Sequence, residues 1–227
     1  MYQVRNLCLS KPTAAASLTR ETHLLQLVFK SSSYMQAITP MKRVVIIGQA
    51  PPRIPAEIPY GRTRLYAWLA KAGVEKNEAL QFFAFTALVN MFPGTAGRSH
   101  KAPDERLIAS SRPKLLAFLR NLRPDIIVPV GVLAIRQCLC NADISLADAV
   151  GQLFVQDPFG PGSLGYNIPI IPLPHPSGAS PWIHQGTNGK QLDRALQLLA
   201  EQLNTLEPNT NHPAAEKSRG GSVAGAD

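Results

Sequence analysis

The sequence predicts an α/β fold, a single domain in which helices flank both faces of a central four-stranded parallel sheet. Short runs of apolar residues, many of them β-branched, alternate along the chain with segments whose leucines recur at helical spacing. The chain has 227 residues and 45% of them are hydrophobic. This length and composition suffice for one sizeable core with additional segments at the two ends.

The predicted strands are short and almost wholly apolar, which is typical of parallel strands that are covered on both faces. The first ends at Gly48 and the third at Gly131, and glycine commonly ends such a run. The expected strands are Val44–Ile47, Phe82–Val89, Asp125–Val130 and Ile168–Ile171.

The segments between these strands show the apolar spacing of amphipathic helices. Gly73 lies at the C′ position of the first helix, where glycine is favoured. Pro113 interrupts the second pattern, and we expect it in the first turn of a separate helical segment. Residues 141–167 lack a regular pattern. The expected helices cover residues 65–72, 107–122, 132–140 and 192–203.

The two ends of the chain differ in composition from the middle. Residues 1–40 are poor in acids and suit either a transit peptide or an upstream extension that precedes a domain starting at Met41. We favour the extension, because Met41 leads directly into the first strand. Residues 41–206 form the predicted domain, and residues 207–227 have the composition of a disordered tail.

Charge and cysteine content bound the function only loosely. The net charge is +8 for the chain and +6 for residues 41–205, which suits a nucleic acid partner but is shared by many metabolic enzymes. The three cysteines form no disulfide or metal-binding pattern, so we expect reduced thiols, no metal and a cytoplasmic protein. No apolar run approaches the ~20 residues of a membrane span. We therefore expect a monomer without a membrane partner.

Three chemically distinctive loops each follow a predicted strand. They are Gly48–Pro52, Asn90–Gly94 and His175–Ser180. Parallel strands end at the same edge of a sheet, where α/β proteins bind their ligands. We therefore expect the three loops to converge on one cleft.

The third loop combines a histidine with small hydroxylated residues. Prolines on both sides restrict the backbone of His175. Ser177, Gly178 and Ser180 suit a loop that approaches a phosphate. A proline-rich turn whose histidine caps a strand is the competing interpretation.

The other two loops supply side-chain amides. Gln49 and Asn90 each carry a donor and an acceptor, which suits recognition of the edge of a flat heterocycle, and Tyr60 can stack on such a ring. Each residue also has a plainer interpretation. Asn90 can be a turn former, Tyr60 a half-buried ring, and Gln49 a backbone-capping or solvated side chain.

Four motifs in order resemble the uracil-DNA glycosylase superfamily, over about residues 42–205. The resemblance is closest to its iron–sulfur branch and that branch's near relatives. Gly48-Gln-Ala-Pro is similar to the first family motif, and His175-Pro-Ser to another. Between them, Pro59-Tyr60-Gly61 is similar to the segment with the stacking ring, and Asn90 with the following Pro93, Gly94 and Arg98 to the segment that recognises the base.

The chain also departs from the family pattern. It lacks the four cysteines of the iron–sulfur members, so no cofactor is expected. Ala50 replaces the acid that organises the water, and Glu57 is the nearest carboxylate. The leucine that some members insert into the base stack falls at Ala179, for which Trp182 or Arg53 can substitute.

The resemblance implies a DNA glycosylase that excises uracil or a related deaminated base, with DNA containing that base as its partner. His175 would donate to the departing base, Gln49 would hold the water, Asn90 would distinguish uracil from cytosine and Tyr60 would stack. A non-catalytic DNA or uracil binder and an unrelated nucleotide-binding enzyme are the alternatives. Further expected base contacts are Gly48, Ala50 and Pro51, and expected DNA contacts are Arg53, Arg98, Ser177, Gly178, Ala179, Ser180 and Trp182.

Overall fold

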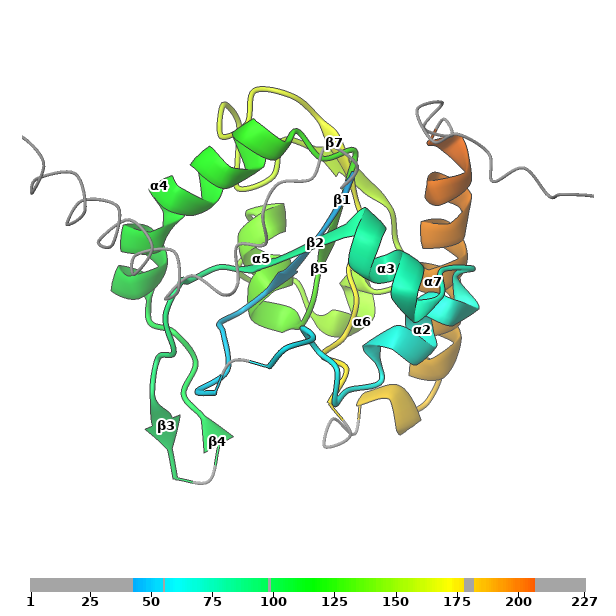
Figure 1. The fold of residues 1–227 in the computed structure, drawn as a ribbon, viewed down its shortest axis with the longest axis horizontal. Helices are drawn as coiled ribbons and strands as arrows, with labels where there is room; N and C mark the ends of the chain where they lie inside the picture. Colours follow the sequence, from blue (N-terminus) through cyan, green and yellow to red (C-terminus); the bar gives the residue numbers. More distant parts are fainter. Residues whose placement is uncertain (1–42, 55, 98, 178–181, 207–227) are drawn as a thin grey trace, which may run out of the picture.

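The computed structural model describes residues 43–54, 56–97, 99–177 and 182–206. Within them the main sheet has five strands in the order β2-β1-β5-β7-β6 (Figure 1). Neighbouring strands in the row β2-β1-β5-β7 are parallel, so the four predicted parallel strands are confirmed. Their bounds are Val44–Gly48 for β1, Phe83–Ala87 for β2, Ile126–Pro129 for β5 and Ile168–Ile170 for β7.

The fifth strand, β6 (Phe154–Gln156), was not predicted. It pairs antiparallel with β7 at the edge of the sheet, inside the region in which we expected no regular structure. The strand is only three residues long, and Val155 at its centre is 60% exposed. A strand this short and open carries too few apolar residues to give a recognisable pattern.

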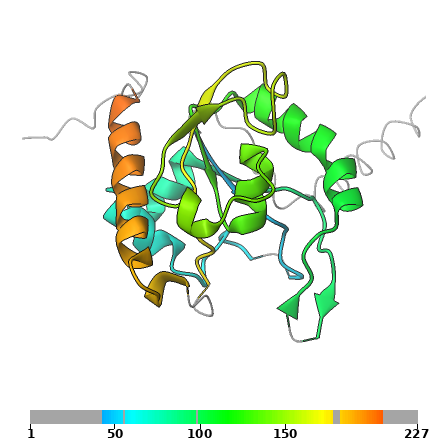
Figure 2. The same cartoon turned by 180° about the vertical axis from the view of Figure 1, so that it is seen from behind.

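Helices cover both faces of the sheet, as predicted (Figures 1 and 2). Alternate residues of β1 divide between the two layers: Val44 and Ile46 pack in one core cluster, and Val45 and Ile47 in the other. The first cluster includes residues of α2 (Leu65–Lys71), α3 (Lys76–Phe82) and α7 (Asn188–Thr205). The second includes residues of α4 (Glu105–Leu122), α5 (Val132–Leu139) and α6 (Leu146–Ala149). None of the helices in the described ranges is long and apolar enough to cross a membrane.

Helix α4 corrects the expectation of a break at Pro113. The helix is 18 residues long and continues unbroken through Pro113. A proline inside a helix removes one backbone hydrogen bond and costs roughly 3 kcal/mol. The cost is tolerated because the helix buries apolar side chains on both sides of the proline, Ile108 before it and Leu115 and Leu119 after it.

Strand β1 lies between β2 and β5, so the chain leaves the end of β1 towards one side of the sheet and reaches β5 on the other. Such a reversal of strand order leaves a crevice beyond the carboxyl ends of the central strands. A second, two-stranded sheet lies beyond β2. Its strands β3 (Thr95–Ala96) and β4 (Ser99–His100) form a hairpin that projects from the body of the domain (Figure 1).

Candidate active site

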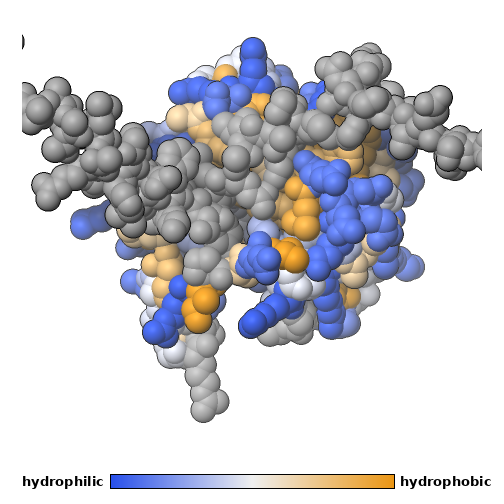
Figure 3. Space-filling view, viewed as in Figure 1, coloured by the Kyte–Doolittle hydropathy of each residue, from blue (hydrophilic) through white to orange (hydrophobic). Residues whose placement is uncertain are grey.

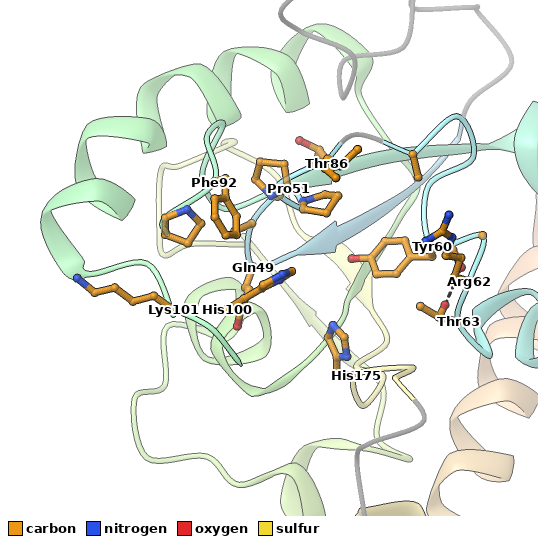
Figure 4. Close-up of a pocket in the computed structure, with 17 residues that line it drawn as sticks. Gln49, Pro51, Tyr60, Arg62, Thr63, Thr86, Phe92, His100, Lys101 and His175 are labelled. Carbon is orange, nitrogen blue, oxygen red and sulfur yellow. Dashed lines mark hydrogen bonds between the residues drawn. The ribbon is translucent and has the colours of Figure 1, made fainter. Parts of the chain in front are cut away.

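A pocket of about 440 Å³ opens at the carboxyl ends of β1 and β2. Gln49, Ala50 and Pro51 of the loop after β1 line it, together with Tyr60 and His175 (Figure 4). These five residues were all candidates from the sequence, and the fold brings them together although 126 positions separate Gln49 from His175. Gly48 is buried at the end of β1 beside them.

Asn90 is the exception among the predicted base contacts. Its side chain is exposed, and Asn90 is not among the residues that line the pocket. The reason lies in the length of β2, which ends at Ala87 rather than Val89. Thr86 and Ala87 therefore reach the pocket, and Asn90 lies three residues beyond it in the chain. The structure does not bring Asn90 to the site at which we expected it to recognise a base.

The predicted DNA contacts are only partly described. Arg53 is exposed beside the lining residues Pro52 and Ile54. Trp182 begins a short 3-10 helix and packs against the core cluster of α2 and α7, which does not suit insertion into a base stack. Arg98, Gly178, Ala179 and Ser180 lie outside the described residues.

Tyr60 adopts a strained backbone conformation at the pocket wall. Its φ is 57°, in the left-handed region that residues other than glycine rarely occupy. The backbone N–H and the hydroxyl of Thr63 both donate to the Tyr60 carbonyl oxygen, at 2.9 Å and 2.8 Å. The buried hydroxyl of Tyr66 donates to the Pro59 carbonyl oxygen at 2.7 Å, and burial raises the pKa of Tyr66 to about 12. These bonds hold the segment that presents the Tyr60 ring.

His175 is placed by the chain on both sides of it. Leu173 forms a parallel bridge with Val130, and the Arg64 N–H donates to the Pro176 carbonyl oxygen at 3.1 Å. The loop is thereby tied both to the end of β5 and to the start of α2. Figure 4 shows the imidazole pointing into the pocket, between Gln49 and Tyr60.

The hydrogen bonding of His175 assigns its proton. The backbone N–H of Ser177 donates to Nδ1 of His175 at 3.3 Å, so Nδ1 is an acceptor and a neutral ring carries its hydrogen on Nε2. The side chain retains contact with solvent, but the protein around it lowers its pKa because desolvation disfavours the charged ring. The lowered pKa favours a neutral imidazole, whose Nε2–H has no hydrogen-bond acceptor among the described residues.

Carboxylates are missing from the described lining of the pocket. Its ionisable side chains are Tyr60, Arg62, His100, Lys101 and His175. Glu57, the acid nearest in sequence, is exposed and does not line the pocket. In the described part of the chain, no cluster of three potential metal ligands occurs.

Part of the pocket was not predicted from the sequence. Phe92 precedes the β3–β4 hairpin, His100 ends β4, Lys101 directly follows it, and Arg62 lies in the loop before α2. The available signal was the pair Gly94 and Gly97, which both have positive φ and allow the chain to turn back.

The chain matches the model of a known protein family. The model of the family described as the uracil DNA glycosylase superfamily matches residues 35–208, which include every described strand and helix. No curated protein matches the chain.

Proposed function

The chain belongs to the uracil DNA glycosylase superfamily, and we propose that it hydrolyses the N-glycosidic bond of uracil or a related deaminated base in DNA. Members of this superfamily are typically glycosylases, which supports the proposed reaction class. The proposal rests on the family and on one feature of the pocket, the neutral imidazole of His175.

The chemistry requires charge stabilisation on the base. As the glycosidic bond breaks, positive charge develops on the sugar and negative charge on the departing base. A hydrogen-bond donor aimed at the base oxygen therefore stabilises the transition state more than the ground state. His175 can supply such a donor from Nε2, because its Nδ1 is occupied by the Ser177 N–H.

The remaining lining residues can position the reactants. Tyr60 offers the face of an aromatic ring to a flat base, and Gln49 offers an amide that can orient a water molecule. A base reaches such a pocket only after it is turned out of the double helix. The pocket meets solvent at Ile54, a lining residue that is 78% exposed.

Basic side chains surround the pocket mouth. Arg53, Arg62, Arg64 and Lys101 are exposed, and none of them takes part in an ion pair with another described residue. In Figure 3 hydrophilic surface lies on both sides of the hollow between the hairpin and the segment leading into α2. Unpaired cations around a pocket suit the phosphates that flank a target nucleotide.

The decisive experiment offers the full-length protein single-stranded and duplex oligonucleotides that contain uracil, hypoxanthine or a thymine mismatch. Alkali cleavage then reveals abasic sites. We expect cleavage on at least one substrate, and His175→Ala should lower single-turnover excision about 10²–10³-fold, the usual loss on removing one preorganised donor. Binding to an uncleavable uracil analogue should change little. Excision within a few-fold of the unmodified protein would show that His175 only caps the strand.

A second candidate function is a non-catalytic DNA or uracil binder on the same scaffold. The observation that favours it is the lack of a carboxylate among the described lining residues, which leaves no acid to organise the water. Binding of uracil-containing DNA without abasic sites on any substrate would support this function and exclude the first.

A further inference from the structure

Two histidines from distant parts of the chain line the same pocket. His175 follows β7, whereas His100 ends β4 at the base of the projecting hairpin. In Figure 4 His100 lies with Lys101 and Phe92 on one side of the pocket, and Tyr60 lies on the other. Nothing in the proposed reaction so far uses the His100 imidazole.

The hairpin holds the His100 ring in a defined place. His100 pairs with Thr95 across the two short strands, and the Lys101 N–H donates to the Gly94 carbonyl oxygen at 3.0 Å. The edge of one ring meets the face of the other between His100 and Phe92, with 5.1 Å between ring centroids and an angle of 81°. Phe92 is itself partly buried and lines the pocket.

Hydrolysis needs a group that accepts a proton from water, and the described lining offers few. Gln49 can orient water but cannot take its proton. Arg62 and Lys101 are cations, and the role proposed for Tyr60 is to stack its ring on the base. His175 already accepts the Ser177 N–H at Nδ1 and serves as a donor at Nε2. Among the ionisable side chains of the described lining, His100 is the one left to accept the water proton.

We propose that His100 is the catalytic base, which takes a proton from the water that attacks the sugar. The inference rests on the glycosylase function proposed above. The water oxygen forms a bond to C1′ as the bond from C1′ to the base breaks, and that electron pair leaves with the base. The water proton moves to a ring nitrogen of His100, while His175 donates a hydrogen bond to the base. The protonated ring later returns its proton to solvent or to the released base.

Histidine is the side chain that most often serves as a general base, because its ring nitrogen can accept a proton from a bound water. The titratable and charged groups that share the pocket with His100 are Tyr60, Arg62, Lys101 and His175. These neighbours include cations and no carboxylate. The described lining therefore offers no anionic side chain as an alternative acceptor for the water proton.

The test compares the full-length protein with His100→Gln and His100→Glu in single-turnover excision from pH 5 to pH 9. His184→Gln, the same change on an exposed residue outside the pocket, is the control. We expect His100→Gln to lose about 100-fold at pH 7.5, the low end for general base catalysis, since a cationic sugar needs little activation of the water. His100→Glu retains a base and should recover at least tenfold over His100→Gln.

The pH profile separates a base from a residue that only shapes the pocket. If His100 accepts the water proton, the shape of the pH profile of excision should change in His100→Gln and stay that of the parent in His184→Gln. A loss of rate at acid pH that persists in His100→Gln is expected from His175, whose pKa is lowered by desolvation. A His100→Gln rate within threefold of the parent, or a slow variant whose pH profile keeps the shape of the parent's, would overturn the proposal.

Two further outcomes are distinguishable. A protein–DNA adduct that survives denaturation and is missing in His100→Gln would show that the ring attacks the sugar itself, which overturns its role as a base. If the unmodified protein produces no abasic sites on any substrate, the proposed glycosylase function fails, and His100 as its catalytic base fails with it. If the parent excises normally and His100→Gln is unaffected, the role of His100 as the base is refuted and the proposed glycosylase function stands.

Discussion

The hydroxyl of Tyr60 lies where a Cβ atom on residue 48 would be, closer than any van der Waals contact allows. Gly48 ends β1, and the Tyr60 ring, which lines the pocket, packs next to it. The glycine at this position is therefore required by the aromatic side chain above it, not by its own backbone conformation. The two residues come from different motifs, and the missing Cβ of Gly48 leaves the space that the Tyr60 hydroxyl occupies.

This contact predicts the effect of Gly48→Ala. The added methyl must displace the Tyr60 ring, and we expect uracil excision to fall at least tenfold. Tyr60→Phe removes the clashing oxygen and leaves Cζ at an ordinary 3.5 Å from the new methyl. The double variant Gly48→Ala/Tyr60→Phe should therefore lose less, relative to Tyr60→Phe, than Gly48→Ala loses relative to the parent.

A matched control is Gly189→Ala in α7, where the new Cβ makes only an ordinary contact, 3.5 Å from the Ile183 carbonyl oxygen. It should leave excision unchanged. If the losses of the Gly48 and Tyr60 variants are additive, a clash with the Tyr60 hydroxyl does not cause the loss of excision in Gly48→Ala.

The lowered pKa of His175 predicts a pH dependence of stability. The unfolded chain takes up a proton on this histidine at about pH 6.5, while the folded protein resists protonation until lower pH. Stability linked to His175 is thus complete above pH 6.5 and is lost as the pH falls towards the lowered value. Thermal unfolding at pH 7.5 and pH 5.5 should show a smaller drop in Tm for His175→Gln than for the parent. Equal drops, with His184→Gln as the reference, would show that His175 is not desolvated.

The end of β2 predicts which of two polar side chains, Thr86 in the strand or Asn90 in the loop after it, affects excision. Thr86 lines the pocket and Asn90 does not. Thr86→Val removes a hydroxyl at nearly constant volume, and the loss of one hydrogen bond of about 0.5–1.5 kcal/mol corresponds to roughly a two- to tenfold slower excision. Asn90→Ala should stay within twofold. A large loss for Asn90→Ala would show that the Asn90 loop closes onto the substrate.

The basic side chains at the pocket mouth predict how affinity responds to salt. Arg62 is exposed, lines the pocket and has no ion pair with a described residue. If it contacts one phosphate, Arg62→Gln should reduce the slope of log Kd against log salt concentration by about one. Arg194→Gln is the control, because Arg194 lies on α7 and pairs with Glu201 at 3.5 Å. Equal slopes for the parent and Arg62→Gln would show that Arg62 does not contact a phosphate.

Local pattern determined most of the fold. Apolar runs such as Val44–Ile47 are buried whole, so their composition alone identifies them as central strands, and the leucine spacing of α7 identifies its buried face. The pattern also placed Gln49, Tyr60 and His175 after the elements that carry them. It could not show β6, which is short and half open, or the continuity of α4 through Pro113, because packing on both sides of the proline offsets a local penalty.

Tertiary structure alone decided which side chains share the pocket. Asn90 and Thr86 are four residues apart, and only the register of β2 against β1, which pairs Thr86 with Ile47, determines that Thr86 reaches the site. His100 enters through the hairpin, whose projection depends on pairing between Thr95 and His100 rather than on any apolar period. Sequence pattern reports what is buried within an element, since burial of one face is a local property. Which polar groups meet at the edge of the sheet depends on strand lengths and loop paths, which are fixed only when the elements pack.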